Sequence, residues 1–263
     1  MASSPGANVE AAEDGVLGVV KIQFDEEIAA RYDETSAHMF RPEVLDKAVD
    51  FLEEWADGSA ALEFGVGTGR VALPLNRRGI SVHGIDLSEP MLEELRKKPG
   101  SERIALTLGD FARTRIDESF RLAYLVFNTI TNLTTQEEQV ACFQNAAAHL
   151  EPGGCFVIEV FVPELRRVPP GERIRPFDVS PTHLAFDEYT DFVAQILYSR
   201  HYWINDGDLR TFSAPYRYVW PSELDLMARL AGMTLRERWA SWTREPFTDE
   251  STSHVSVWQK TGT

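Results

Sequence analysis

The segment from residue 60 to residue 70, which reads AALEFGVGTGR, constrains the fold of this chain more than any other. It begins as a short apolar strand and continues into three glycines at every second position, after which residues 71–78 are interpreted as a helix. This pattern predicts a strand, a tight turn and a helix N-terminus, where backbone N–H groups point outward to meet a ligand. Glycine is required at such a turn because a Cβ atom would block both the turn and the close approach of a ligand.

The spacing of these glycines separates two classes of ligand. A dinucleotide-binding turn has the form G-x-G-x-x-G, and Arg70 occupies the place of its third glycine. Glu63 lies two residues before the first glycine, where a carboxylate is unfavourable beside a pyrophosphate but suits an ammonium group. Both features count against a nucleotide-binding oxidoreductase. That class stays as an alternative, together with an ordinary strand-to-helix turn and a non-catalytic nucleotide-binding protein.

The form E-x-G-x-G-x-G, made by Glu63, Gly65, Gly67 and Gly69, resembles the cofactor loop of class I S-adenosylmethionine-dependent methyltransferases. The resemblance implies that S-adenosylmethionine is the cofactor and that these four residues contact it, with Glu63, Gly65 and Gly67 at its amino-acid end. It also implies an α/β fold with a seven-stranded, doubly wound, Rossmann-like sheet and an antiparallel β insertion over the active site.

A second motif lies in a predicted strand at residues 80–86 and a following helix that Ser88 caps. Asp86 stands at the strand end, where a carboxylate can accept hydrogen bonds from both ribose hydroxyls, as in NAD-binding sheets. The run GIDLSEPML is very similar to the corresponding methyltransferase segment, which implies that Leu87 and Met91 touch the adenine. The alternative is that Asp86 only caps the next helix.

Two further strands are predicted at residues 103–108 and 120–128. After the first, the resemblance implies that Asp110 accepts a hydrogen bond from the adenine amino group and that the neighbouring backbone N–H, at Phe111, meets the ring. A plain polar turn would have the same sequence. The second strand ends near Phe127, at the edge where open α/β sheets bind ligands, so Phe127 is a further candidate for cofactor contact.

The simple alternation of strands and helices stops after a fifth strand, at residues 155–161, which LEPGG precedes as in the family pattern. Residues 183–219 are rich in β-forming residues, and the Asp-Gly pair at 206–207 predicts a hairpin. We interpret this region as an antiparallel insertion that covers the cofactor pocket. A helix at 221–232 and closing antiparallel strands at 233–239 and 254–260 complete the predicted fold.

Aromatic residues concentrate in the two parts of the chain that the sheet does not require. One is the N-terminal segment, with predicted helices at residues 25–31 and 42–55, and the other is the insertion. The resemblance implies that Tyr32 covers the methyl end of the cofactor, where aromatic rings attract a sulfonium. The predicted acceptor site consists of Phe24, Tyr32, Asn132, Tyr202 and Tyr216. The alternative is that these rings pack within the hairpin or at an oligomer interface.

The chain of 263 residues, 43% of them hydrophobic, is long enough for one large domain with an insertion. We expect a disordered tail at residues 1–18, a helical lid at 19–56 and a methyltransferase domain at 57–263, with the insertion at about 183–219. A net charge of −15 argues against a nucleic-acid partner, and no apolar run reaches the length of about 18–20 residues of a membrane span. Two cysteines without a metal-site pattern, and an N-terminus unlike a signal peptide, indicate a cytoplasmic protein without a metal.

The predicted activity is methyl transfer from S-adenosylmethionine to a small-molecule acceptor. The chain looks most similar to methyltransferases that tailor antibiotics and amino sugars. No catalytic residue is assigned, because none of His38, His183 and His201 stands out as a base. An amine acceptor needs no strong base, so the sequence favours N-methylation, with O-methylation of a hydroxyl or carboxyl group as the alternative. A homo-oligomer remains an open alternative.

Overall fold

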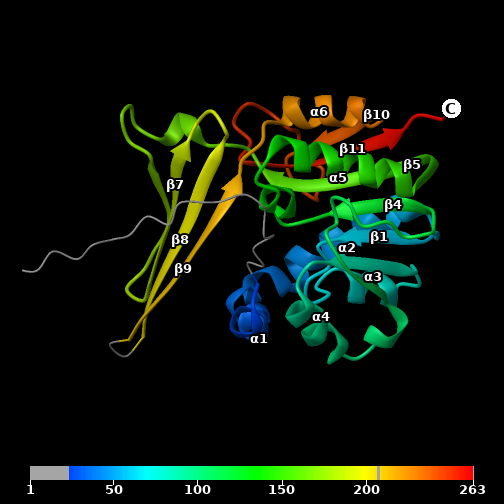
Figure 1. Cartoon of the computed structure of the whole chain (residues 1–263), viewed down its shortest axis with the longest axis horizontal. Helices are drawn as coiled ribbons and strands as arrows, with labels where there is room; N and C mark the ends of the chain where they lie inside the picture. The colour runs from blue at the N-terminus through cyan, green and yellow to red at the C-terminus, as the bar shows by residue number, and fades with distance from the viewer. Residues whose placement is uncertain (1–23, 206–207, 263) are drawn as a thin grey trace, which may run out of the picture.

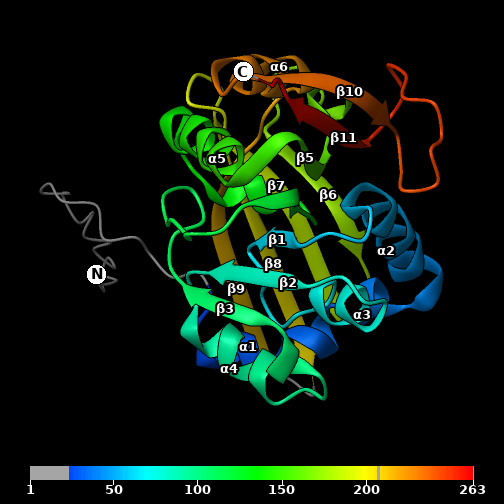
Figure 2. The ribbon, with the colours of Figure 1, turned by 90° about the vertical axis from the view of Figure 1, so that its right-hand side faces the viewer.

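In the computed structural model, which describes residues 24–205 and 208–262, the chain forms two β-sheets and their flanking helices. Figure 1 shows the larger sheet on one side of the molecule, the smaller sheet on the other, and α1 between them. Figure 2 shows the strands of the small sheet behind those of the large sheet, so the small sheet lies across one end of the large one. The tail expected at residues 1–18 lies outside the described residues.

The large sheet has seven strands in the order β10-β11-β5-β4-β1-β2-β3. Its parallel part places β1 between β2 and β4, and β11 runs antiparallel to both β5 and β10. This arrangement confirms the predicted fold class. The strands are β1 (Ala61–Phe64), β2 (Val82–Asp86), β3 (Ala105–Leu108), β4 (Phe120–Leu125), β5 (Leu150–Phe161), β10 (Met233–Trp239) and β11 (Ser253–Lys260).

Helices cover both faces of the large sheet, which explains why its central strands are apolar on both sides. One core cluster joins the strands to α5 and α6, and a second joins them to α2, α3 and α4. The α-helices are α1 (Glu26–Thr35), α2 (Pro42–Ala56), α3 (Ala72–Arg77), α4 (Glu89–Arg96), α5 (Gln136–His149) and α6 (Pro221–Leu230). The 3₁₀-helices are η1 (Ala37–Phe40), η2 (Ser101–Arg103), η3 (Thr129–Asn132) and η4 (Leu165–Arg167). None of the helices in the described part of the chain is long and apolar enough to cross a membrane.

The small sheet is the predicted antiparallel insertion. Its order is β6-β7-β8-β9, and the strands are β6 (Ile174–Val179), β7 (His183–Asp191), β8 (Ile196–Asn205) and β9 (Asp208–Arg217). β8 and β9 pair up to Asn205 and Asp208, as expected of a hairpin at that point. The sequence did not predict β6, whose exposed pattern offers little alternation.

Two of the differences between the predicted and the observed strands have a clear cause. The predicted β-rich region at 183–219 is interrupted at residues 192–195, which form a turn because the Asp191 carboxylate accepts hydrogen bonds from the Val193 and Ala194 N–H groups at 2.8 and 2.9 Å. β5 begins at Leu150 rather than at residue 155. There Gly153, at φ 78°, lets the chain bulge, and the pairing with β4 shifts register.

The glycine loop (residues 65–70) packs directly on β2. A Cβ atom built on Gly84 would lie 2.7 Å from the Cβ and Cγ2 atoms of Val66, closer than non-bonded carbon atoms approach. Gly84 has ordinary strand geometry, so its lack of a side chain serves this close approach and not an unusual turn. The position of the loop is therefore set by packing against the neighbouring strand.

Gly84→Ala is expected to destabilise the protein by about 1–3 kcal/mol, because the new methyl group overlaps the Val66 side chain. Urea unfolding measures this loss. Val66→Ala removes the opposing methyl groups, so the double variant should lose less stability than the sum of the two single variants. Strict additivity would contradict the contact.

Candidate functional site

The candidate site lies where β1 and β4 end side by side and their chains continue in different directions, the position at which open α/β sheets bind ligands. The glycine loop after β1 forms the predicted turn, with Gly65, Gly67 and Gly69 at φ 67°, 53° and 79°. A Cβ atom on Gly65 would lie 2.6 Å from Cγ2 of Thr129, beyond the end of β4. Around Gly67 the nearest atom to such a Cβ, Cε of Met91, is 3.5 Å away, so this part of the loop lies open.

Asp86 joins the end of β2 to the glycine loop. Its Oδ2 accepts a hydrogen bond from the Gly67 N–H at 2.7 Å, and its Oδ1 accepts one from the Ser88 N–H at 2.9 Å. Burial raises the pKa of Asp86, and these backbone hydrogen bonds oppose the shift. The cap of α4 is Ser88, whose Oγ accepts from the Met91 N–H. Each Asp86 oxygen keeps a further lone pair for a ligand hydroxyl.

Glu63 is a buried carboxyl beneath the loop. Its side chain faces α2 and α3, and its Oε2 accepts a hydrogen bond from the Tyr124 hydroxyl at 2.9 Å. Burial raises the pKa of Glu63 to about 8, although Tyr124 and the nearby Arg70 act in the opposite direction. A positively charged ligand group beside Glu63 would favour its ionised form.

The remaining predicted cofactor residues surround the same edge of the sheet. Leu87 is partly buried directly after Asp86, and Met91 is buried in the first turns of α4. Asp110 accepts a hydrogen bond from the Ala112 N–H at 2.8 Å, in the turn after β3. The Phe111 ring stacks on Phe64 in the core at 5.9 Å, so only the backbone of Phe111 belongs to this edge.

Phe127 and Asn128, just after β4, hold the left-handed backbone conformation at φ 54° and 60°, which is strained for residues with side chains. Glu159 of β5 fixes this turn, because its carboxylate accepts hydrogen bonds from the Phe127 N–H at 2.9 Å and from Trp242 Nε1 at 2.7 Å. The Arg70 guanidinium lies over the Phe127 ring at 5.5 Å. The sequence did not reveal Glu159, because its partners are distant in the chain.

Helix α1 lies against the glycine loop. Asp33 accepts a hydrogen bond from Thr68 Oγ1 at 2.6 Å and pairs with Lys98, which in turn donates to the Thr68 carbonyl at 2.7 Å. Tyr32, one residue earlier, is half-buried near Arg70 and Asp86. The predicted segment around Tyr32 therefore does meet the predicted cofactor loop, through partners that no sequence motif indicated.

Two of the acceptor candidates, Tyr202 and Tyr216, lie on opposite faces of the small sheet. One face of this sheet is called the inner face here. It carries the side chains of residues 183, 185, 187 and 189 in β7, of residues 197, 199, 201 and 203 in β8, and of residues 210, 212, 214 and 216 in β9. Tyr216 lies on the inner face, close enough to Tyr32 for their charges to interact, and burial raises its pKa strongly. Tyr202 lies on the opposite face, stacked on Phe186 at 5.9 Å, because strand residues alternate. The structure does not bring Tyr202 to the site.

The two remaining acceptor candidates, Phe24 and Asn132, lie outside the small sheet. The Phe24 ring meets Tyr32 edge to face at 5.9 Å, and its carbonyl accepts a hydrogen bond from Ser88 Oγ at 2.6 Å. Asn132 of η3 donates to the Thr129 carbonyl at 3.0 Å. Its Oδ1 atom is buried and has no hydrogen-bond partner among the described residues. An unpartnered buried carbonyl oxygen is a ready acceptor for a ligand N–H or O–H group.

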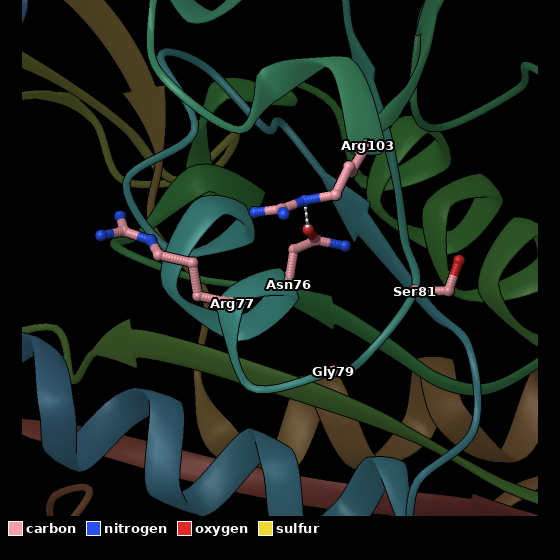
Figure 3. A pocket seen from close by; sticks show the side chains of 5 residues that line it. All are labelled: Asn76, Arg77, Gly79, Ser81 and Arg103. Carbon is pink, nitrogen blue, oxygen red and sulfur yellow. Dashed lines mark hydrogen bonds between the residues drawn. The ribbon is translucent and has the colours of Figure 1, made fainter.

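A shallow cavity of about 360 Å³ lies at the opposite edge of the large sheet, where β2 and β3 begin (Figure 3). It is lined by Asn76, Arg77, Gly79, Ser81 and Arg103. Arg103 Nε donates to Asn76 Oδ1 at 3.1 Å, so this guanidinium is already engaged. The cavity is separate from the candidate site. No cluster of metal-ligating side chains occurs within residues 24–205 and 208–262.

The fold and the glycine loop together define a methyltransferase. A family model described as a methyltransferase domain matches residues 61–154. The structure of the CcbJ methyltransferase from Streptomyces caelestis is 35% identical and covers 91% of this chain and 98% of its own, with a TM-score of 0.82. The chain belongs to the class I S-adenosylmethionine-dependent methyltransferase family, which decides against the oxidoreductase alternative. It is an enzyme of that family, and its cofactor is S-adenosylmethionine.

Two relatives carry names that describe an acceptor. The cypemycin N-terminal methyltransferase of Streptomyces sp is 28% identical over 206 residues, which are 78% of this chain and 84% of the relative. The dTDP-3-amino-3,4,6-trideoxy-alpha-D-glucopyranose N,N-dimethyltransferase of Streptomyces venezuelae is 32% identical over 103 residues, 39% of this chain and 43% of the relative. These similarities agree with a small-molecule methyltransferase.

Glu63→Gln is expected to remove a pH dependence of stability. The pKa of Glu63 in the folded protein, about 8, lies above its ordinary value of 4.5, so the folded chain holds a proton that the unfolded chain has lost. Wild-type stability should therefore fall relative to the variant as the pH rises through this window, by about 1.4 kcal/mol per pH unit, and level off above it. Urea unfolding of both proteins near pH 6 and near pH 8 measures the difference. Parallel pH profiles would mean that Glu63 is already ionised.

Proposed function

We propose that this enzyme transfers a methyl group from S-adenosylmethionine to an amine nitrogen of a small molecule, an amino sugar or another secondary metabolite. The observation that carries the proposal is that α1 holds Tyr32 beside the glycine loop, and that Tyr216 on the inner face of the small sheet is near enough to Tyr32 for Tyr32 to influence its pKa. Burial raises the pKa of both phenols, so both stay protonated at neutral pH. Protonated phenols can enclose an acceptor but cannot deprotonate a hydroxyl group, whereas the nitrogen of an amine is nucleophilic whenever the amine is in its neutral form.

The residues at the sheet edge fit the cofactor. In this proposal Glu63, Gly65 and Gly67 hold the amino-acid end, where the buried Glu63 carboxyl meets the ammonium group. Gly69 packs on Leu95 and lets the loop turn into α3. Asp86 accepts from the ribose hydroxyls, and Leu87 and Met91 contact the adenine. Asp110, Phe111 through its backbone, and Phe127 complete the cofactor site.

The bound cofactor supplies an electrophilic methyl group, and the chain supplies alignment and exclusion of water. Tyr32 is held over the loop by α1, whose Asp33 is tied to Thr68 and Lys98. Tyr216 approaches from the small sheet, and Phe24 meets Tyr32 edge to face. The unpartnered Asn132 Oδ1 accepts a hydrogen bond from the acceptor and orients it.

The names of the relatives support the choice of nitrogen. The cypemycin enzyme is named for an N-terminus, and the amino-sugar enzyme is named as an N,N-dimethyltransferase. We extend methylation at nitrogen to the present chain as a proposal. O-methylation is the alternative outcome of the acceptor test below.

Asp86→Ala is expected to weaken S-adenosylmethionine binding about tenfold or more, because hydrogen bonds to a charged group contribute about 1.5–3 kcal/mol each. Isothermal titration calorimetry measures the affinity. Ser88→Ala is the matched control, since it removes the cap of α4 and should lower the melting temperature with a much smaller effect on affinity. A loss of melting temperature in Asp86→Ala with unchanged affinity would reduce Asp86 to a structural role.

The nature of the acceptor is tested with pairs of compounds that differ only by an amino or a hydroxyl group on one carbon. The pairs should include amino sugars and short peptides with a free or a hydroxyl-replaced N-terminus. Mass spectrometry is expected to detect methylated product from the amine of each reactive pair, and NMR to place the methyl group on nitrogen. Products from the hydroxyl compounds would favour O-methylation and contradict the proposal.

A further inference from the structure

A row of polar side chains runs along the inner face of the small sheet, from its buried part near Tyr216 to its exposed rim. Strand register places Asp187 beside Ser199, and Ala185 beside His201. As direct cross-strand partners, Ser199 and Asp187 have side chains on the same face, and the Ser199 hydroxyl lowers the pKa of the Asp187 carboxyl, as a hydroxyl that can donate to a carboxylate does. Ser199 Oγ also lies 3.3 Å from His201 Nε2. The row therefore begins at a carboxylate in the interior and continues to an imidazole.

The second half of the row leads to solvent. His201 Nδ1 lies 3.1 Å from His183 Nε2, and His183 Nδ1 lies 2.8 Å from Asp178 Oδ2. The two imidazole rings stack on each other at 5.3 Å, and both stack on Trp203, which holds them in line. The Asp178 side chain is 48% exposed, whereas Ser199 is only 8% exposed. Hydrogen-bond contacts thus connect Ser199, the cross-strand neighbour of the half-buried Asp187, to the surface.

The interior end of the row belongs to the proposed acceptor site. Asp187 is near enough to Tyr216 to raise its pKa, and Tyr216 interacts in the same way with Tyr32 of α1. The other charged groups that face Asp187 are Arg175 of β6 and Glu164, which form an ion pair with each other. Arg175, the cross-strand partner of Asp187 in β6, lowers the pKa of Asp187 and Glu164 raises it, and the Arg175 guanidinium is engaged by the Glu164 carboxylate.

We propose that Asp187 binds the ammonium form of the acceptor amine and takes its proton, and that Ser199, His201 and His183 conduct this proton to Asp178 at the rim. The inference rests on the proposed N-methylation, and it identifies the acceptor as an amine that arrives as a cation. An ammonium has no lone pair, so it must lose one proton before its nitrogen can attack. The nitrogen then forms a bond to the methyl carbon, the bond from that carbon to sulfur breaks, and the product leaves as a methylated ammonium.

The protons balance along the row. Once Asp187 has accepted the proton, its O–H group donates to Ser199 Oγ, and the Ser199 hydroxyl turns to His201. Asp187 then passes its proton to Ser199 Oγ while Ser199 passes its hydroxyl proton to His201 Nε2. His201 Nδ1 passes its proton to His183 Nε2, and His183 Nδ1 passes its own through Asp178 to water. Asp187 is again ionised, and both imidazoles return to their first tautomer by proton exchange before the next turnover. Each transfer crosses one contact of the row, and burial raises the pKa of Asp187 to about 6, nearer to that of an amine.

The first test uses Asp187→Asn with saturating S-adenosylmethionine. Its acceptor is an amine that the pairs of amino and hydroxyl compounds have shown to be methylated. We expect an unchanged affinity for the cofactor and a fall of about tenfold or more in kcat/KM near pH 7. The variant should then recover about tenfold per pH unit up to the pKa of the free amine, because the neutral fraction rises in that proportion. A purely structural defect would not follow this slope.

Glu188→Gln is the matched control. Glu188 is the next residue of β7, lies on the opposite face and is hydrogen-bonded to Arg200 at 2.6 Å, so its neutralisation should leave turnover and pH profile unchanged. Wild-type turnover in Asp187→Asn, or a loss that higher pH does not restore, would overturn the proposal. Methylation of the hydroxyl compounds by the wild-type enzyme would instead overturn the proposed function. That result is seen in the methylated product and needs no variant, so the two failures can be distinguished.

The second test needs no acceptor. NMR of the imidazole nitrogens reports the tautomer of each histidine. Asp187→Asn and Ser199→Ala should both shift the His201 signals, and Ser199→Ala should lower kcat with little change in cofactor affinity. His201 signals that are the same in Asp187→Asn and Glu188→Gln would show that the row is not connected, and would overturn the proton path.

Discussion

The hydrogen bond from the Gly67 N–H to the Asp86 carboxylate holds together the parts of the protein on which the site depends. It links the loop after β1 to the end of β2, where the backbone pairing of the two strands has stopped. Gly67 can make this bond because its φ of 53° turns the N–H toward Asp86. The Val66 side chain, packed against Gly84, holds the loop against β2. Contacts within the chain therefore fix the conformation of the loop, and a preformed loop lowers the entropic cost of binding.

Helix α1 is anchored to the same loop. Thr68, between two of the glycines, contacts Asp33 through its hydroxyl and Lys98 through its carbonyl. In the proposed complex this places Tyr32 over the acceptor site as a direct consequence of the loop conformation. The cofactor site and the acceptor site therefore share one set of supporting contacts, and a change in the loop is expected to disturb both.

The sequence was sufficient for the parallel part of the fold because each of its motifs is local. Each motif is a strand followed by a turn and a helix start, and it depends on residues within one short segment. Examples are the segment from Glu63 to Gly69 and the pair Asp86 and Ser88. The small sheet was harder to predict because side-chain direction depends on register. The turn at residues 192–195 decides that Ser199 faces Asp187 and that Tyr202 points away from Tyr216. The row from Asp187 to Asp178 joins three strands, so no single stretch of sequence displays it.

Three carboxyl groups of the candidate and proposed sites are buried or half-buried and form no ion pair among the described residues. Burial raises the pKa of Glu63 to about 8 and that of Asp187 to about 6, and it also raises the pKa of Asp86. Such groups cost stability in the free protein, because desolvation disfavours their charged form. In the proposed complex the cofactor ammonium faces Glu63 and the acceptor amine faces Asp187, so each ligand supplies the charge that its carboxyl lacks. Binding of a cation then offsets the hydration free energy that the carboxyl group lost on folding. A neutral acceptor would leave Asp187 unpaired, so this arrangement of charge itself selects for an amine.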